Sequence, residues 1–147
     1  MTGTVRLHRV LRAPPERIYR AFTDPRAMCK WLPPHGFVGE VFEMEAKAGG
    51  KWRMAFTNLG NGHGHSFGGI YIECAPGERL VYTSVFDDPN LQGEMRTTIM
   101  LRGVMGCTEL HAVQEGIPDV IPVEMCYLGW QESLMLLKQL VEADIPG

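Results

Sequence analysis

Residues 118–143, PDVIPVEMCYLGWQESLMLLKQLVEA, decide the fold. In this stretch apolar side chains recur at helical spacing, while polar side chains lie elsewhere around the helical wheel. Asp119 can cap the helix, Pro122 is tolerated only in its first turn, and Ile145-Pro146 prevents it from continuing. The stretch predicts one amphipathic helix of about 35 Å. Its apolar face comprises Cys126, Trp130, Leu134, Leu137 and Val141.

The N-terminal region predicts one strand followed by two short helices. Val5 to Leu11 alternates apolar and basic residues, as a half-buried strand does. Pro14-Pro15 stops this strand and can open a helix, because proline is tolerated in a first helical turn. Asp24 followed by Pro25 repeats the signal for a second helix that ends near Trp31. The first helix should carry inward Ile18, Tyr19 and Phe22.

From Phe37 to Gln114 the hydrophobic period changes to two, which is typical of strands. Glycine and proline separate the periodic segments by short turns, and short turns join antiparallel neighbours. In the first of these hairpins, Phe42, Met44 and Ala46 share one face. The predicted class is α+β: a helix-grip fold in which a curved antiparallel sheet of about six to seven strands wraps around the long C-terminal helix.

This arrangement leaves part of the sheet uncovered. A helix about 10 Å wide cannot cover the concave face of a curved sheet of about seven strands, so a space should remain beside it. Large, pliable side chains facing that space would suit an apolar ligand, although the same side chains also suit an ordinary solid core. The predicted cavity residues are Phe42, Met44, Trp52, Met54, Phe56, Tyr71, Tyr82, Ile99, Leu110, Trp130, Leu134 and Leu137.

Three polar residues are candidates for the same cavity. Arg9 shares strand parity with apolar neighbours and can point inward, where Glu73 could pair with it; alternatively it reaches solvent at the sheet edge. His111, together with Tyr71, could supply a proton donor or acceptor. Because no nucleophile triad, phosphate-binding glycine motif or paired-carboxylate signature is present, we predict no catalytic residue.

His63 and His65 form an HxH pair, which in a strand would place both imidazoles on one side, as metal ligands require. A tight site needs one or two more ligands, and His35 or Glu73 could contribute only if the fold brings them close. The flanking glycines instead indicate a mobile, solvated loop. We therefore predict neither a metal site nor a cofactor.

Composition limits the remaining possibilities. A chain of 147 residues, 45% hydrophobic and 21% charged, fits one globular domain over residues 1–147. Its net charge of −3 argues against a nucleic-acid partner. Without a long apolar segment, a signal peptide or a cysteine framework, we expect a cytoplasmic protein, not inserted in a membrane, with reduced thiols. It should be a monomer or a homodimer.

Several blocks of the sequence resemble one family. RVLRAPPERIYRAFTDP (residues 9–25) and WLPPHGF (31–37) are similar to the opening of the activator-of-heat-shock-ATPase-homologue branch of the START-like, or birch-pollen-allergen-like, superfamily. The blocks that follow in the same order are GGKWR (49–53), GIYIE (69–73), ERLVYT (78–83), TEL (108–110) and GWQESL (129–134). Four positions depart from the family pattern: Leu32 replaces a tryptophan, Cys126 a histidine, and Val113-Gln114 a Thr-His pair.

The resemblance implies a helix-grip fold with a hydrophobic cavity, but no fixed chemistry, because the superfamily includes lipid carriers, hormone receptors, polyketide cyclases and aromatases. We expect the chain to bind a hydrophobic small molecule, lipid-like or aromatic, between the sheet and the long helix. A cyclase- or dehydratase-type enzyme that uses the same cavity is one alternative. A co-chaperone-like module with a chaperone partner is another.

Overall fold

The computed structural model describes residues 2–146 and contains one antiparallel sheet and three helices within them. The strands are β1 (Gly3–Leu11), β2 (Phe37–Met44), β3 (Lys51–Asn58), β4 (Gly64–Ala75), β5 (Arg79–Phe86), β6 (Met95–Val104) and β7 (Cys107–Ile117). The helices are α1 (Pro15–Thr23), α2 (Pro25–Trp31) and α3 (Val123–Val141). The predicted α+β helix-grip fold is confirmed.

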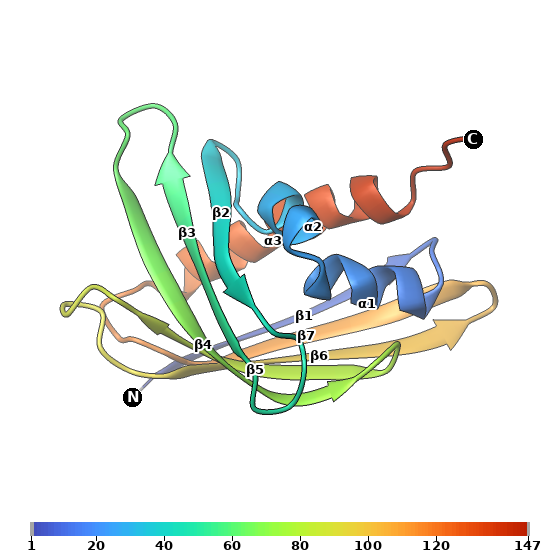
Figure 1. Ribbon diagram of the computed structural model, residues 1–147, viewed down its shortest axis with the longest axis horizontal. Coiled ribbons are helices and arrows are strands. Elements are labelled where there is room, and N and C mark those ends of the chain that lie inside the picture. Colours follow the sequence, from blue (N-terminus) through green and yellow to red (C-terminus); the bar gives the residue numbers. More distant parts are fainter. Residues whose placement is uncertain (1, 147) are drawn as a thin grey trace.

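The order of the strands is β1-β7-β6-β5-β4-β3-β2, so α1 and α2 carry the chain from one edge of the sheet to the other. Figure 1 shows the sheet curving upward toward β2 and β3, with all three helices on its concave side. No helix in the described part of the chain is long and apolar enough to cross a membrane. Within residues 2–146, the helices cover the concave face of the sheet and leave its convex face uncovered.

The short helices form where the prolines predict them, and they close one end of the core. Asp24 accepts a hydrogen bond from the backbone N–H of Arg26 at 2.9 Å and thereby caps α2. Trp31 is fully buried at the end of α2, and its indole Nε1 donates to the carbonyl oxygen of Ala21 at 2.7 Å. As predicted, α1 turns inward the side chains Ile18, Tyr19 and Phe22.

α3 is shorter than the sequence pattern predicts. It begins after Pro122, whose φ of −61° and ψ of 132° are extended, and it ends at Val141. Pro122 is therefore the N-cap residue and is not part of the first turn. Beyond the helix, a Glu142 carboxylate oxygen accepts from the backbone N–H of Arg12 at 2.8 Å. This contact ties the end of α3 to the turn after β1.

A bulge in β2 changes the direction of one predicted core residue. The pairing with β3 shifts between Val41 and Glu43, so one extra residue is inserted into β2 at this point. Phe42 is 58% exposed as a result, and the prediction that it faces inward with Met44 is wrong. Met44 lies beyond the bulge, opposite Trp52, and remains partly buried against the core.

The buried face of α3 can be tested with two substitutions of similar size on the same helix. Leu137 is completely buried, so Leu137→Ala should lower the free energy of unfolding by about 2–5 kcal/mol. Met135 is exposed, and Met135→Ala should change the free energy of unfolding by no more than about 0.5 kcal/mol. Urea unfolding followed by circular dichroism measures both. Equal losses would contradict this assignment of the helix faces.

Candidate functional site

A cavity of about 180 Å³ lies between α3 and the concave face of the sheet. Helix α3 lines one wall, strands β3 to β7 line the opposite wall, and α1, α2 and the segment after α2 close the remaining side. Its lining is mainly aromatic and aliphatic. The lining residues are Phe22, Met28, Leu32, Pro34, Trp52, Phe56, His65, Phe67, Tyr71, Tyr82, Ser84, Phe86, Met95, Thr97, Gln114, Cys126, Gly129, Trp130 and Ser133.

Five of the predicted cavity residues line it: Trp52, Phe56, Tyr71, Tyr82 and Trp130. Six others lie in or against the packed core instead, namely Met44, Met54, Ile99, Leu110, Leu134 and Leu137. A period of two identifies the inner face of a strand, but it does not show where along that strand the helices stop covering the sheet. The eight strand residues among these eleven therefore lie on the predicted side of the sheet and the three helix residues face it, but only five of the eleven reach the cavity.

The three polar candidates lie outside the lining. Arg9 is half-buried, and its guanidinium Nη1 donates to the carbonyl oxygen of His8 at 2.8 Å. Glu73 is exposed and forms an ion pair with Arg79 at 3.1 Å, because a register shift between Tyr71 and Glu73 turns the carboxylate outward. His111 is exposed on the convex face. The expected pairing of Arg9 with Glu73 does not occur.

The HxH pair is divided by the start of β4. His65 lies in the strand at the rim of the cavity, and its ring contacts the rings of Phe56, Phe67 and Phe86 at centroid distances of 5.7, 5.8 and 5.7 Å. His63 precedes the strand in an exposed turn. Within residues 2–146, neither histidine belongs to a group of three potential metal ligands. Of the two histidines in the HxH pair, His65 lines the cavity and His63 does not.

Thr97 is a polar cavity residue that sequence reasoning did not identify. It is 1% exposed, and its Oγ1 makes no hydrogen bond of standard geometry within residues 2–146, although it interacts with the Tyr82 hydroxyl. Its register partner on β5 is Tyr82, so two hydroxyl-bearing side chains lie next to each other in the lining. The sequence does indicate this position, because Thr97 lies two residues before Ile99, a predicted inner-face residue. The structure shows the same alternation: Met95, Thr97 and Ile99 are buried, whereas the residues between them are exposed or half-buried. Strand parity alone would have placed Thr97 on the inner face.

The lining is electrically neutral at neutral pH. Burial raises the pKa of Tyr82 to about 12, with the Thr97 hydroxyl opposing the rise, and burial also holds the pKa of Tyr71 well above its ordinary value. Burial likewise raises the pKa of the Cys126 thiol. Burial lowers the pKa of His65, a shift that Asp88 partly opposes. No lysine, arginine, aspartate or glutamate is among the lining residues described above.

Two polar side chains of the lining have hydrogen-bond partners on neighbouring elements. The indole Nε1 of Trp130 donates to Gln114 Oε1 at 3.0 Å, and Ser133 Oγ donates to the carbonyl oxygen of Leu32 at 2.5 Å. These bonds join α3 to β7 and to the end of α2. They fix the cavity walls, so the hydroxyl of Thr97, with those of Tyr71 and Tyr82, is available to interact with a bound molecule.

The state of the Thr97 hydroxyl can be tested against a paired threonine. An unpaired buried hydroxyl is unfavourable, so Thr97→Val should leave the free energy of unfolding unchanged or raise it by up to about 1 kcal/mol. Thr108 is equally buried, but its Oγ1 donates to the carbonyl oxygen of Ala13 at 2.7 Å. Thr108→Val should cost about 1–3 kcal/mol, because the carbonyl loses its partner. Thermal and urea unfolding measure both; a comparable loss in Thr97→Val would show that its hydroxyl is paired.

Comparisons with known proteins agree with this architecture. A protein from Chromobacterium violaceum is 57% identical, with a TM-score of 0.95 over 96% of this chain and 98% of that one. A Rhodobacter sphaeroides protein shares the fold at 24% identity, with a TM-score of 0.80 and 95% of each chain covered. The same holds for a Silicibacter pomeroyi protein at 19% identity, with a TM-score of 0.81 over 94% of this chain and 96% of that one.

The comparison with curated proteins gave no match. The family model that matches residues 12–142 is described as "Activator of Hsp90 ATPase homolog 1-like protein". This match spans almost all of the strands and helices described above, and it confirms the resemblance read from the sequence blocks. The chain belongs to the family of Activator of Hsp90 ATPase homolog 1-like proteins.

Proposed function

We propose that the protein binds a neutral, mainly apolar small molecule that carries one hydroxyl or carbonyl group. The observation that supports this most strongly is the buried Thr97 hydroxyl, which interacts with Tyr82 but makes no hydrogen bond of standard geometry among the described residues, inside a cavity lined mainly by aromatic and aliphatic side chains. A ligand that hydrogen-bonds to Thr97 Oγ1 would satisfy that hydroxyl while burying apolar surface. The ligand-binding fold of the family is consistent with this role.

The size of the cavity limits the ligand. An apolar cavity of about 150 Å³ is sufficient to bind benzene. The cavity here, at about 180 Å³, suits one or two fused rings or an aliphatic group of similar volume. A long acyl chain would have to extend through the rim near His65 and Phe86.

The neutral lining limits the charge of the ligand. Transferring an ionised carboxylate or ammonium group into a site with no opposite charge is strongly unfavourable. Tyr71 and Tyr82 remain protonated and can only offer neutral hydroxyl groups. We therefore expect the protein to prefer an alcohol, phenol or ketone over an acid or amine of the same shape.

Gly129 supports the view that the space is functional. It lies inside α3, where a glycine costs about 1 kcal/mol relative to alanine. A Cβ built at this position would meet no atom within 4 Å, and Gly129 lines the cavity. A larger residue would improve the helix and fill the space, so the glycine keeps the cavity open at the expense of helix stability.

The enzymatic alternative receives no comparable support. It required an acid or base in the cavity, and of its candidates only Tyr71 lines it, with a pKa that burial raises. Glu73 and His111 are exposed away from the lining. Binding of a chaperone remains a prediction from the family resemblance.

Three probes of one shape test the preferred ligand class. We expect 2-naphthol to bind most tightly, naphthalene less tightly, and 2-naphthoate more weakly than 2-naphthol by on the order of tenfold or more. In Thr97→Val, 2-naphthol should lose about 1 kcal/mol of binding free energy, whereas naphthalene should be unaffected. Calorimetric titration and ligand-observed NMR measure the affinities. Tighter binding of the naphthoate, or an equal loss for both neutral probes, would contradict the proposal.

Gly129 provides a blocking variant. Gly129→Leu places a side chain in the cavity and should abolish binding of 2-naphthol without lowering the thermal midpoint, since glycine is the poorer helix former. The control is Leu128→Ala, an exposed neighbour on α3, which should bind as the parent protein does. If Gly129→Leu binds 2-naphthol with unchanged affinity, the probe occupies another site and the proposed cavity is wrong.

A further inference from the structure

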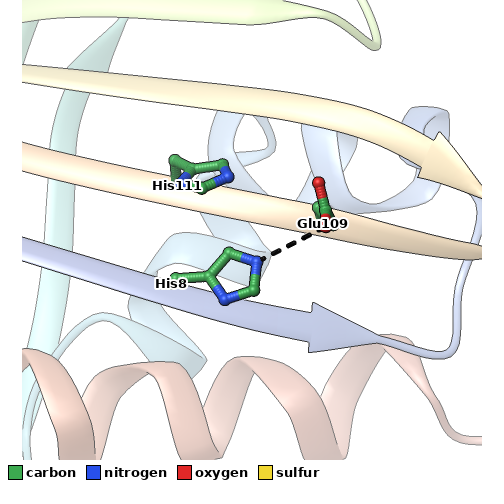
Figure 2. A group of neighbouring side chains, drawn as sticks. All are labelled: His8, Glu109 and His111. Atoms are coloured by element: carbon green, nitrogen blue, oxygen red, sulfur yellow. Dashed lines mark ion pairs between the residues drawn. The ribbon is translucent and has the colours of Figure 1, made fainter.

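We propose that the convex face of the sheet carries a binding site for Zn²⁺ or a divalent transition ion of similar softness, formed by His8, Glu109 and His111. Figure 2 shows the three side chains on the neighbouring strands β1 and β7. Their ligand atoms all lie within 4.8 Å of one another. Because sequence analysis predicts no metal site, this inference comes from the fold alone.

The pairing of the strands brings the three residues together. His8 and His111 are directly opposite in the β1–β7 register, and Glu109 lies two residues before His111, so it projects to the same face. The register is unbroken from Val5 to Leu11. Because the backbone of both strands is already ordered, binding a metal would cost little conformational entropy.

The distances allow closure around a metal ion. His8 Nε2 and Glu109 Oε1 are 3.8 Å apart, and the ring centroids of His8 and His111 are 4.6 Å apart. Ligand atoms that share one Zn²⁺ at about 2.0–2.2 Å lie about 3.3–3.6 Å from each other in a tetrahedral site. Side-chain rotations that move the ligand atoms by about 1–2 Å would therefore complete the coordination, without movement of the strands.

Arg102 orients the carboxylate. Its Nη2 donates to Glu109 Oε2 at 2.8 Å, while the other oxygen, Oε1, faces His8. A metal bound at Oε1 leaves this ion pair intact, and a hydrogen-bonded carboxylate is the usual arrangement around metal sites. Arg102, Glu109 and His111 also border a surface hollow with Met100 and Leu101, which leaves room for water ligands.

The donor set defines the ion class. Two imidazoles and one carboxylate suit Zn²⁺, Ni²⁺ or Cu²⁺, whereas Ca²⁺ and Mg²⁺ prefer oxygen ligands alone. Three protein ligands leave at least one position open. The exposed side of the site faces solvent, because the His8 side chain is 47% exposed. The bound ion would thus carry an exchangeable ligand on the face of the sheet opposite the cavity.

Titration of the chelator-treated protein with ZnCl₂ tests this site. We expect one Zn²⁺ per chain with a Kd at or below roughly 10 μM. Glu109→Gln and the double substitution His8→Ala/His111→Ala should each weaken binding by on the order of tenfold or more, and His63→Ala should leave it unchanged. Imidazole NMR signals of His8 and His111 should shift on addition of Zn²⁺, whereas those of His35 and His63 should not.

Two results would overturn the proposal: retention of the parent affinity in the His8→Ala/His111→Ala variant, or loss of binding in His63→Ala. The folded state of each variant is checked by its thermal midpoint, which should change little because His8 and His111 are exposed. Binding of 2-naphthol to the same variants separates this site from the cavity. We expect unchanged 2-naphthol affinity in every histidine variant of the convex face.

Discussion

The structure depends on one geometric constraint: a single helix of 19 residues must cover the concave face of a seven-stranded sheet. An exposed apolar sheet face is unfavourable, yet α3 is too narrow to cover all of it. α1 and α2 cover part of what remains, and the buried Trp31, held by its bond to the Ala21 carbonyl oxygen, fixes them in place. The uncovered part between these helices is the cavity, which is therefore a consequence of the layer architecture.

The sequence predicted the elements well because their signals are local. Asp24-Pro25 marks a helix start, and the apolar spacing around Trp130 marks the buried face of α3. Bulges are less visible: the register shift beside Phe42 turned a predicted core residue outward, and another beside Glu73 removed a predicted partner of Arg9. One inserted residue changes the face of the sheet on which the following side chains lie, and no residue type in β2 or β4 predicts the insertion.

Contacts between distant strands were beyond the reach of the sequence pattern. His63 and His65 stand close together in the chain, but β4 begins between them and they face different surroundings. His8 and His111 are far apart in the chain, and only the pairing of β1 with β7 makes them neighbours. Spacing along the chain therefore cannot identify which histidines become neighbours, because sheet topology determines which side chains meet.

The fold is shared by proteins whose sequences differ widely from that of this chain. Proteins only 19% and 24% identical retain the architecture with TM-scores near 0.8, so the covering constraint is satisfied by many sequences. Of the four residues that the sequence comparison with the family pattern singled out, Leu32, Gln114 and Cys126 line the cavity. Gln114 accepts the Trp130 indole hydrogen, and Leu32 accepts from Ser133 through its backbone. A different side chain at these positions would change the chemistry of the cavity, which is one way in which a shared fold can accept different ligands.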